Sequence, residues 1–232
     1  MTVTLEEVRE RLAAREAGKA PDFSNEKLTG LDLSGADLRG VCFSWADLSD
    51  TRLDGADMDG CVLDNAMMNR CSLRGTSLRN ASVQGVNFRW SDLTGLHVEG
   101  SNLWRSVFEY AVMDGITADE RTAFFRMYCP EKGAFLAYKK CFNDRLVQLL
   151  VPADARRVSA ACNACRCDKA KVLSIKSFDY EERFTEAWSL VDENFVYRVG
   201  EWVEAKNYNP DRWMESTGGI HFWMTREEAL AY

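Results

Sequence analysis

Three cysteines lie close together between residues 162 and 167, in the sequence Cys-Asn-Ala-Cys-Arg-Cys. Tetrahedral zinc sites often begin with two cysteines separated by two residues, and zinc prefers thiolate and imidazole ligands. Because a second pair at the usual spacing does not follow, the alternative is a group of thiols without a metal. The candidate ligands are Cys162, Cys165 and Cys167, with His221, Cys129 or Cys141 as the fourth. We expect no cofactor, with zinc at these residues as the alternative.

A second candidate site is a basic stretch in an acidic chain. Residues 139–176 contain nine lysines and arginines against three aspartates, whereas the whole chain has a net charge of −7. Guanidinium and ammonium groups form charge-assisted hydrogen bonds with anions, and aromatic rings can stack on a base. The alternative is a solvated face of strands. The candidate residues for a small anionic ligand are Arg156, Arg157, Arg166, Lys169 and Lys171, with Trp213 and Trp223 for stacking.

Composition limits the class of protein. The chain has 232 residues, of which 46% are hydrophobic and 11% aromatic, as expected for a globular protein of one or two domains. We expect no membrane span, because no apolar run approaches the required length of about 18 residues. The net negative charge argues against general binding to nucleic acids.

The elements that position these residues begin with an internal repeat. An apolar residue returns at every fifth position from Leu28 to Met113, usually preceded by a small or apolar residue two positions earlier. A helix has a period of 3.6 residues and a strand a period of two, so the pattern predicts neither element alone. A five-residue unit cannot bury its own apolar side chain, and we expect successive coils to stack with these two positions inward.

The repeat resembles the pentapeptide-repeat proteins in units such as ADLRG (36–40), ADLSD (46–50) and ADMDG (56–60). The resemblance implies a right-handed quadrilateral parallel β-helix over residues 23–115, with four units in each coil. Residues 28–64 contain eight aspartates and two arginines. Some acidic members of the family imitate DNA and inhibit topoisomerases, so the resemblance keeps that function open, although five arginines in residues 65–113 interrupt an acidic track.

Short helices are expected at both ends of the repeat. Thr4 and Glu7 have the spacing of a capping box, which predicts a capping helix within residues 1–22. Thr117 and Glu120 have the same spacing, which predicts a capping or linker helix over residues 116–130 that ends at Pro130.

Residues 131–232 are expected to form a separate α+β domain. Asn143-Asp144 between two apolar runs predicts a hairpin turn, and strands are expected over 171–175, 195–199 and 220–224. Thr225 and Glu228 predict a final helix. This part resembles an uncharacterised domain found at the C-termini of some phage and bacterial pentapeptide-repeat proteins, which implies no known activity.

These features favour a non-enzymatic binding protein. In this hypothesis the repeat is a rigid scaffold or oligomerisation surface, the C-terminal domain recognises a partner, and the partner is another protein or a second copy. One alternative is a phage-borne counter-defence protein that sequesters a small anion such as a signalling nucleotide, and DNA mimicry is another. An enzyme would require paired acid and base groups with perturbed pKa values in one cleft. The N-terminus lacks the pattern of a signal peptide, so we expect the protein to be located in the cytoplasm of a bacterium or of a phage-infected host.

Overall fold

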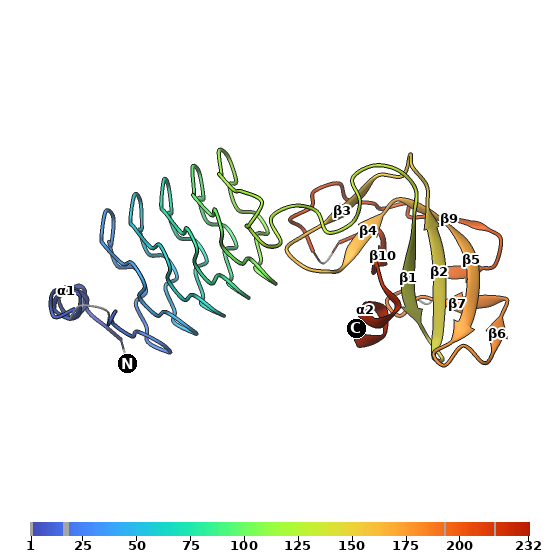
Figure 1. The fold of residues 1–232 in the computed structure, drawn as a ribbon, viewed down its shortest axis with the longest axis horizontal. Coiled ribbons are helices and arrows are strands. Elements are labelled where there is room, and N and C mark those ends of the chain that lie inside the picture. Colours follow the sequence, from blue (N-terminus) through green and yellow to red (C-terminus); the bar gives the residue numbers. More distant parts are fainter. Residues whose placement is uncertain (1, 16–18, 193, 216) are drawn as a thin grey trace. The chain divides into compact units, whose positions relative to one another are not determined.

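The computed structural model describes residues 2–15, 19–192, 194–215 and 217–232. The chain divides into two compact units, Met1–Arg126 and Met127–Tyr232, which are called here the repeat unit and the C-terminal unit. Figure 1 shows the stacked coils of the first unit and the strands of the second.

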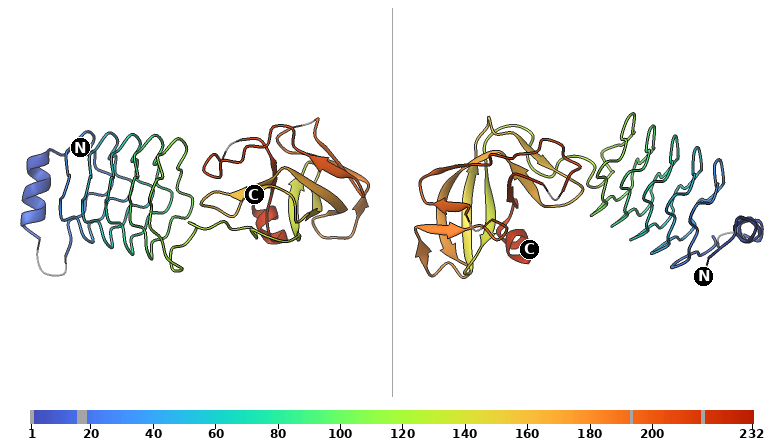
Figure 2. Two further views of the ribbon diagram at one scale, coloured as in Figure 1. Left: turned by 90° about the horizontal axis from the view of Figure 1, so that it is seen from above. Right: turned by 180° about the vertical axis from the view of Figure 1, so that it is seen from behind.

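The repeat unit is a parallel β-solenoid with twenty residues in each coil. From the Asp22–Cys42 bridge to the His97–Thr117 bridge, its bridges join residues twenty positions apart, for example Asp32 with Arg52 and Asp57 with Ser77. Four five-residue units therefore make one coil, as the resemblance implied. The left view of Figure 2 shows the coils lying side by side from the blue to the green part of the chain. The last bridge joins Asn102 with Ala123, so the final coil contains one additional residue.

Two inward columns stabilise the solenoid in different ways. The leucine, phenylalanine and methionine column is buried, and Leu63 and Leu73 have no exposed surface. Hydroxyl and thiol groups of the second column donate hydrogen bonds to main-chain carbonyls 23 residues earlier. Thr51 Oγ1 lies 3.1 Å from the Leu28 carbonyl oxygen, and Ser91 Oγ lies 2.7 Å from that of Met68. The small inward residues were expected from the repeat, but their role as hydrogen-bond donors was not.

The N-terminal helix contacts the first coil. Helix α1 (Leu5–Ala13) begins with the expected capping box, in which the Thr4 main-chain nitrogen donates to Glu7 Oε2 at 2.7 Å. Arg11 forms an ion pair with Glu26 at 2.9 Å and lies over the Phe23 ring at 3.9 Å. These contacts join the helix to the first coil.

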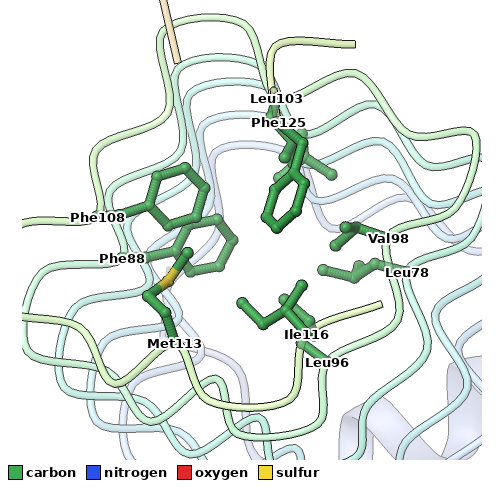
Figure 3. Close-up of a pocket in the computed structure, with 10 residues that line it drawn as sticks. Leu78, Phe88, Leu96, Val98, Leu103, Phe108, Met113, Ile116 and Phe125 are labelled. Carbon is green, nitrogen blue, oxygen red and sulfur yellow. The ribbon is translucent and has the colours of Figure 1, made fainter. Parts of the chain in front are cut away.

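The prediction of a helix over residues 116–130 is wrong. The Thr117 nitrogen donates to the Leu96 carbonyl at 2.9 Å, and the Ala123 nitrogen donates to the Ser101 carbonyl at 2.8 Å. These residues therefore continue the solenoid, because pairing with the preceding coil satisfies more main-chain groups than one local capping box. Figure 3 shows Phe125 among the apolar side chains at this end, around a cavity of about 10 Å³.

The C-terminal unit contains three small antiparallel sheets. The strands of the largest sheet are β1 (Phe135–Cys141), β2 (Arg145–Val151), β5 (Lys169–Ser177), β6 (Arg183–Phe184) and β9 (Trp202–Glu204). The second sheet has the order β10 (Ile220–Phe222), β4 (Cys165–Cys167) and β3 (Arg157–Ser159). The remaining strands, β7 (Glu186–Trp188) and β8 (Val196–Arg198), form a hairpin. Helix α2 (Arg226–Ala231) follows the second sheet.

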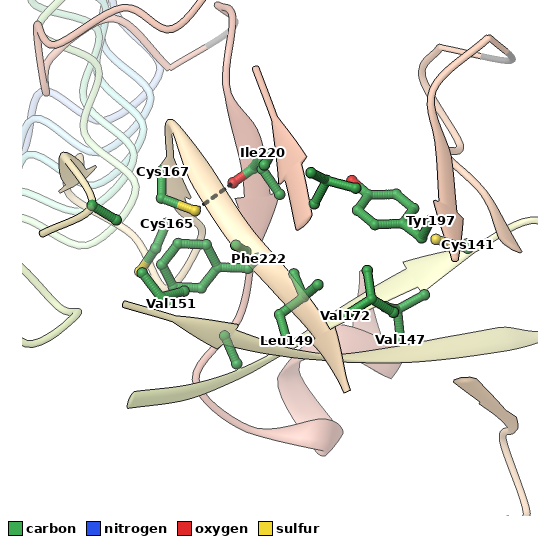
Figure 4. Close-up of a cluster of buried hydrophobic side chains, with 14 of the residues drawn as sticks. Cys141, Val147, Leu149, Val151, Cys165, Cys167, Val172, Tyr197, Ile220 and Phe222 are labelled. Atoms are coloured by element: carbon green, nitrogen blue, oxygen red, sulfur yellow. Dashed lines mark hydrogen bonds between the residues drawn. The ribbon is translucent and has the colours of Figure 1, made fainter. Parts of the chain in front are cut away.

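The local predictions for this unit are confirmed. Strands β1 and β2 pair across Asn143 and Asp144, which both have a positive φ. Thr225 and Glu228 form a capping box at α2. Figure 4 shows the apolar core, in which Val147, Leu149 and Val172 lie near Phe222 and Tyr197 from other sheets.

We predict that the inward column of the repeat determines its stability. Leu73→Ala is expected to lower the free energy of unfolding by about 2–5 kcal/mol, because it leaves a cavity in a fully buried column. The matched control is Arg74→Ala, whose side chain is 57% exposed and which should cost less than about 1 kcal/mol. Urea denaturation of both variants measures the difference, and equal losses would contradict this assignment of inward positions.

Candidate functional site

The C-terminal unit contains a cavity of about 1060 Å³, which is called here the Lys139 cavity. Its walls come from strands β1, β4 and β10 and from parts of the segments 189–195 and 204–219. Binding sites for small molecules typically have volumes of about 300–1,000 Å³. The volume of the cavity is therefore sufficient for a small ligand.

Lys139 is a buried cation on the wall of this cavity. It alternates with Ala137 and Cys141 along β1, so its side chain lies on the core face of the strand, and it is only 4% exposed. Lys139 Nζ lies 6.0 Å from the centre of the Trp223 ring, which also lines the cavity. Among the described residues, Lys139 Nζ has neither a hydrogen-bond acceptor nor a carboxylate at ion-pair distance.

Burial lowers the pKa of Lys139, because it removes water from the ammonium group. The nearby thiols of Cys141 and Cys167 oppose this effect. His221 lines the same cavity, and its pKa is lowered by burial and by the charges of Lys139 and Arg166. The imidazole of His221 is therefore neutral at neutral pH. The protonated form of Lys139 is disfavoured, because burial removes water from its ammonium group.

Arg166 provides a second buried cation and also holds part of the wall. It lies in β4, is 3% exposed and lines the cavity. Its Nε donates to the Asn209 carbonyl at 3.3 Å, and its Nη2 donates to the Asp211 carbonyl. Gly219 makes this arrangement possible, because it has a positive φ and a Cβ there would lie 3.1 Å from Arg166 Cδ.

The carboxylates around the cavity are less buried than the two cations. Asp192 and Glu204 are exposed, and Glu215 is half-buried. Lys206 is an exposed cation on the same wall. Among the described residues that line the cavity, the buried charges are therefore Lys139 and Arg166, so its interior favours a ligand with negative charge.

The structure brings only two of the candidate anion-binding residues, Arg166 and Trp223, into this cavity. Arg156 pairs with Asp168 at 2.8 Å, and Lys169 pairs with Asp154 at 2.6 Å. Two more candidates outside the cavity have aromatic or cationic neighbours: Lys171 lies over the Trp202 ring, and Trp213 lies beneath Arg212.

The side chain of Arg157 has a structural role. Its guanidinium group is buried and donates hydrogen bonds to main-chain carbonyls from two segments of the C-terminal unit. The acceptors are the carbonyl oxygens of Ala155, Gly133, Pro152, Ala153 and Pro130. Loop carbonyls that leave water require such partners, so this side chain holds the two segments together.

The candidate zinc ligands do not surround one point. Cys165 and Cys167 lie on the core face of β4, and Cys167 Sγ donates to the Ile220 carbonyl at 3.9 Å (Figure 4). His221 pairs with Arg166 in the neighbouring strand, so its side chain lies on the opposite face of the sheet. In the part of the chain that the structure describes, no three His, Cys, Asp or Glu side chains are arranged to bind a metal ion.

Lys139 lines the cavity but was not among the candidate binding residues predicted from the sequence. It belongs to the basic stretch, but one lysine among nine basic residues carries no individual signal. The available signal is its position in β1, where the alternation of Ala137, Lys139 and Cys141 places a lysine on an otherwise apolar face.

We predict that Arg157 contributes to stability much more than its neighbour Arg156. Arg157→Ala is expected to lower the free energy of unfolding by about 3 kcal/mol, because one buried and four partly buried main-chain carbonyls lose a charged donor. Arg156→Ala should cost less than about 1 kcal/mol, because the Arg156 side chain is 65% exposed and its ion pair is screened by water. Urea denaturation distinguishes the two variants, and similar midpoints would show that the carbonyl contacts of Arg157 contribute little.

Lys139 should also make stability depend on pH. Its folded pKa lies below the ordinary value of 10.5, so between these two values the unfolded chain binds more protons than the folded chain. The free energy of unfolding must then rise with pH across this interval. Lys139→Met lacks this contribution, so its free energy of unfolding relative to that of the parent should fall as the pH rises towards 10.5. Denaturation midpoints measure the difference, and a constant difference would refute the lowered pKa.

Comparisons with known proteins assign a family to each unit. Residues 22–55 and 56–95 match pentapeptide repeats, and residues 125–229 match a family of unknown function (DUF5758). No curated protein matches the chain. In the described residues, no helix is both long and apolar enough to cross a membrane.

Solved structures resemble the chain through its repeats. A pentapeptide repeat protein from the cyanobacterium Cyanothece 51142 is 31% identical over 41% of this chain and 62% of its own, with a TM-score of 0.33. This chain thus spans less than two thirds of that protein. One from the Arabidopsis thaliana thylakoid lumen is 23% identical over 42% of this chain and 71% of its own, with a TM-score of 0.34. Two stretches of the repeat unit therefore match pentapeptide repeats, and most of the C-terminal unit matches a family of unknown function.

Proposed function

We propose that the protein is a binding protein in which the Lys139 cavity takes up a small anionic molecule. The repeat unit acts as a rigid scaffold or self-association surface, and its coils wind in a right-handed direction. The C-terminal unit is the recognition module, as in the leading hypothesis from the sequence. The ligand is a small anion rather than a protein, as in the alternative hypothesis. A cytoplasmic location and a phage or bacterial origin are parts of the same proposal.

The observation that carries this proposal is the environment of Lys139. A buried ammonium group is costly unless it is paired, and Lys139 has no anionic partner among the described residues. A ligand carboxylate or phosphate in the cavity would provide that partner. Arg166 adds positive charge on the same wall, and the ring of Trp223 adds an apolar surface.

The repeat unit supports the scaffold role through its regular hydrogen bonding. Main-chain groups pair with the next coil from Phe23 to Ala123, which leaves few degrees of freedom in the solenoid. DNA mimicry is disfavoured by the pairing of its acids. Asp50 bonds Arg70 at 2.7 Å, and Asp37 bonds Arg39 at 2.7 Å, so these carboxylates do not form an unneutralised phosphate-like track.

Calorimetry on the full chain tests the proposal with inorganic phosphate, a nucleoside monophosphate and pyruvate as probes. We expect at least one anion to bind, and Lys139→Met should weaken its binding by about tenfold or more, as loss of a charge-assisted contact predicts. The matched control is Lys140→Met. Lys140 lies on the same strand, but its Nζ is 3.4 Å from the Leu230 carbonyl oxygen.

The comparison of the two variants decides the outcome. Full binding by Lys140→Met and weakened binding by Lys139→Met would support the cavity as the site. Equal binding by Lys139→Met and the parent, or no binding of any probe to the parent, would overturn the proposal. Binding of the nucleotide or phosphate alone would identify a phosphate ligand, and binding of pyruvate alone would identify a carboxylate.

A further inference from the structure

We propose that Lys139 captures its ligand covalently, by forming a reversible imine with a small 2-oxo acid. This inference rests on the proposed function, since it names the class of anion that the Lys139 cavity binds. It assigns a chemical role to the amine itself, beyond the attraction between its charge and an anion.

The side chain of Lys139 meets the requirements of an amine nucleophile. A lysine reacts with a carbonyl only in its neutral form, and burial without a carboxylate partner favours that form. No ion pair with Lys139 occurs among the described residues, so no protein anion holds the proton on this nitrogen. The lowered pKa of Lys139 agrees with this environment.

Arg166 lies on the same wall and suits the carboxylate of a 2-oxo acid. Its Nε and Nη2 atoms hold the loop carbonyls of Asn209 and Asp211, so the guanidinium group is fixed in place. The same group lines the cavity, where it provides a permanent positive charge. A carboxylate beside Arg166 would keep the neighbouring keto group within the cavity that Lys139 also lines.

His221 supplies a route for the protons. It lies beside Arg166 in the register of β10 and β4 and lines the cavity with Lys139. Its pKa is lowered by burial and by the charge of Lys139, so a neutral imidazole is available to accept a proton. This makes His221 a group that can move protons between the amine and the carbonyl oxygen.

The reaction balances without an oxidant or a reductant. The Lys139 nitrogen attacks the keto carbon, a carbon–nitrogen bond forms, and the carbonyl oxygen gains a proton that the nitrogen loses. The carbon–oxygen bond of this carbinolamine then breaks, water leaves, and the nitrogen forms a double bond with the carbon. His221 transfers the protons, and addition of water reverses each step.

Reductive trapping on the full chain tests the inference. The parent is incubated with glyoxylate, pyruvate or 2-oxoglutarate, treated with sodium borohydride, and analysed by intact mass and peptide mapping. We expect one adduct per chain, located at Lys139 and more abundant than at any other lysine, because its burial favours the neutral amine. Lys139→Met should lose this adduct, and Lys140→Met should retain it.

Binding measurements separate the failure of this inference from the failure of the proposed function. Calorimetry compares each 2-oxo acid with its 2-hydroxy acid, which carries the same charge but has no carbonyl. Binding of both acids without a trapped adduct would overturn the imine and leave the anion site standing. Absence of both binding and adduct would overturn both proposals. Adducts spread evenly over the lysines would also overturn the imine, and peptide mapping of the parent gives this result even if Lys139→Met does not fold.

Discussion

The requirement that buried main-chain groups find hydrogen-bond partners governs both units of this protein. In the repeat unit each coil satisfies the next, and the same requirement draws residues 116–125 into the solenoid instead of a helix. In the C-terminal unit Arg157 serves the same need with a side chain, because loop carbonyls there have no neighbouring strand.

Against this background Lys139 is an exception with a chemical meaning. A buried group without a partner costs free energy in the empty protein, and a ligand that supplies the partner recovers part of it. Arg156 and Lys169 in the C-terminal unit show the opposite arrangement, since they are already paired with aspartates at the surface. A buried positive charge without an anionic partner therefore indicates a binding site more strongly than the number of basic residues does.

The sequence predicted the repeat far better than the site. A period of five places Leu63 and Leu73 inward whatever the outer residues are, so their burial follows from spacing alone. Thr117 and Glu120 led to the wrong prediction of a helix, because a capping box is a local signal. The local sequence does not show pairing with the preceding coil. The cavity depends on contacts between distant strands, such as β1 with Trp223, and no local pattern specifies them.

The extra residue in the final coil changes the phase of the repeat. Earlier coils keep an interval of twenty residues, so every fifth side chain returns to the same column, but Asn102 pairs with Ala123 at an interval of 21. Any unit added after Ala123 in the old phase would carry its leucine one position out of line with Leu103. A single inserted residue thus breaks the alignment of the columns in the last coil, so a further unit would keep its place in the stack only with a compensating shift of one residue.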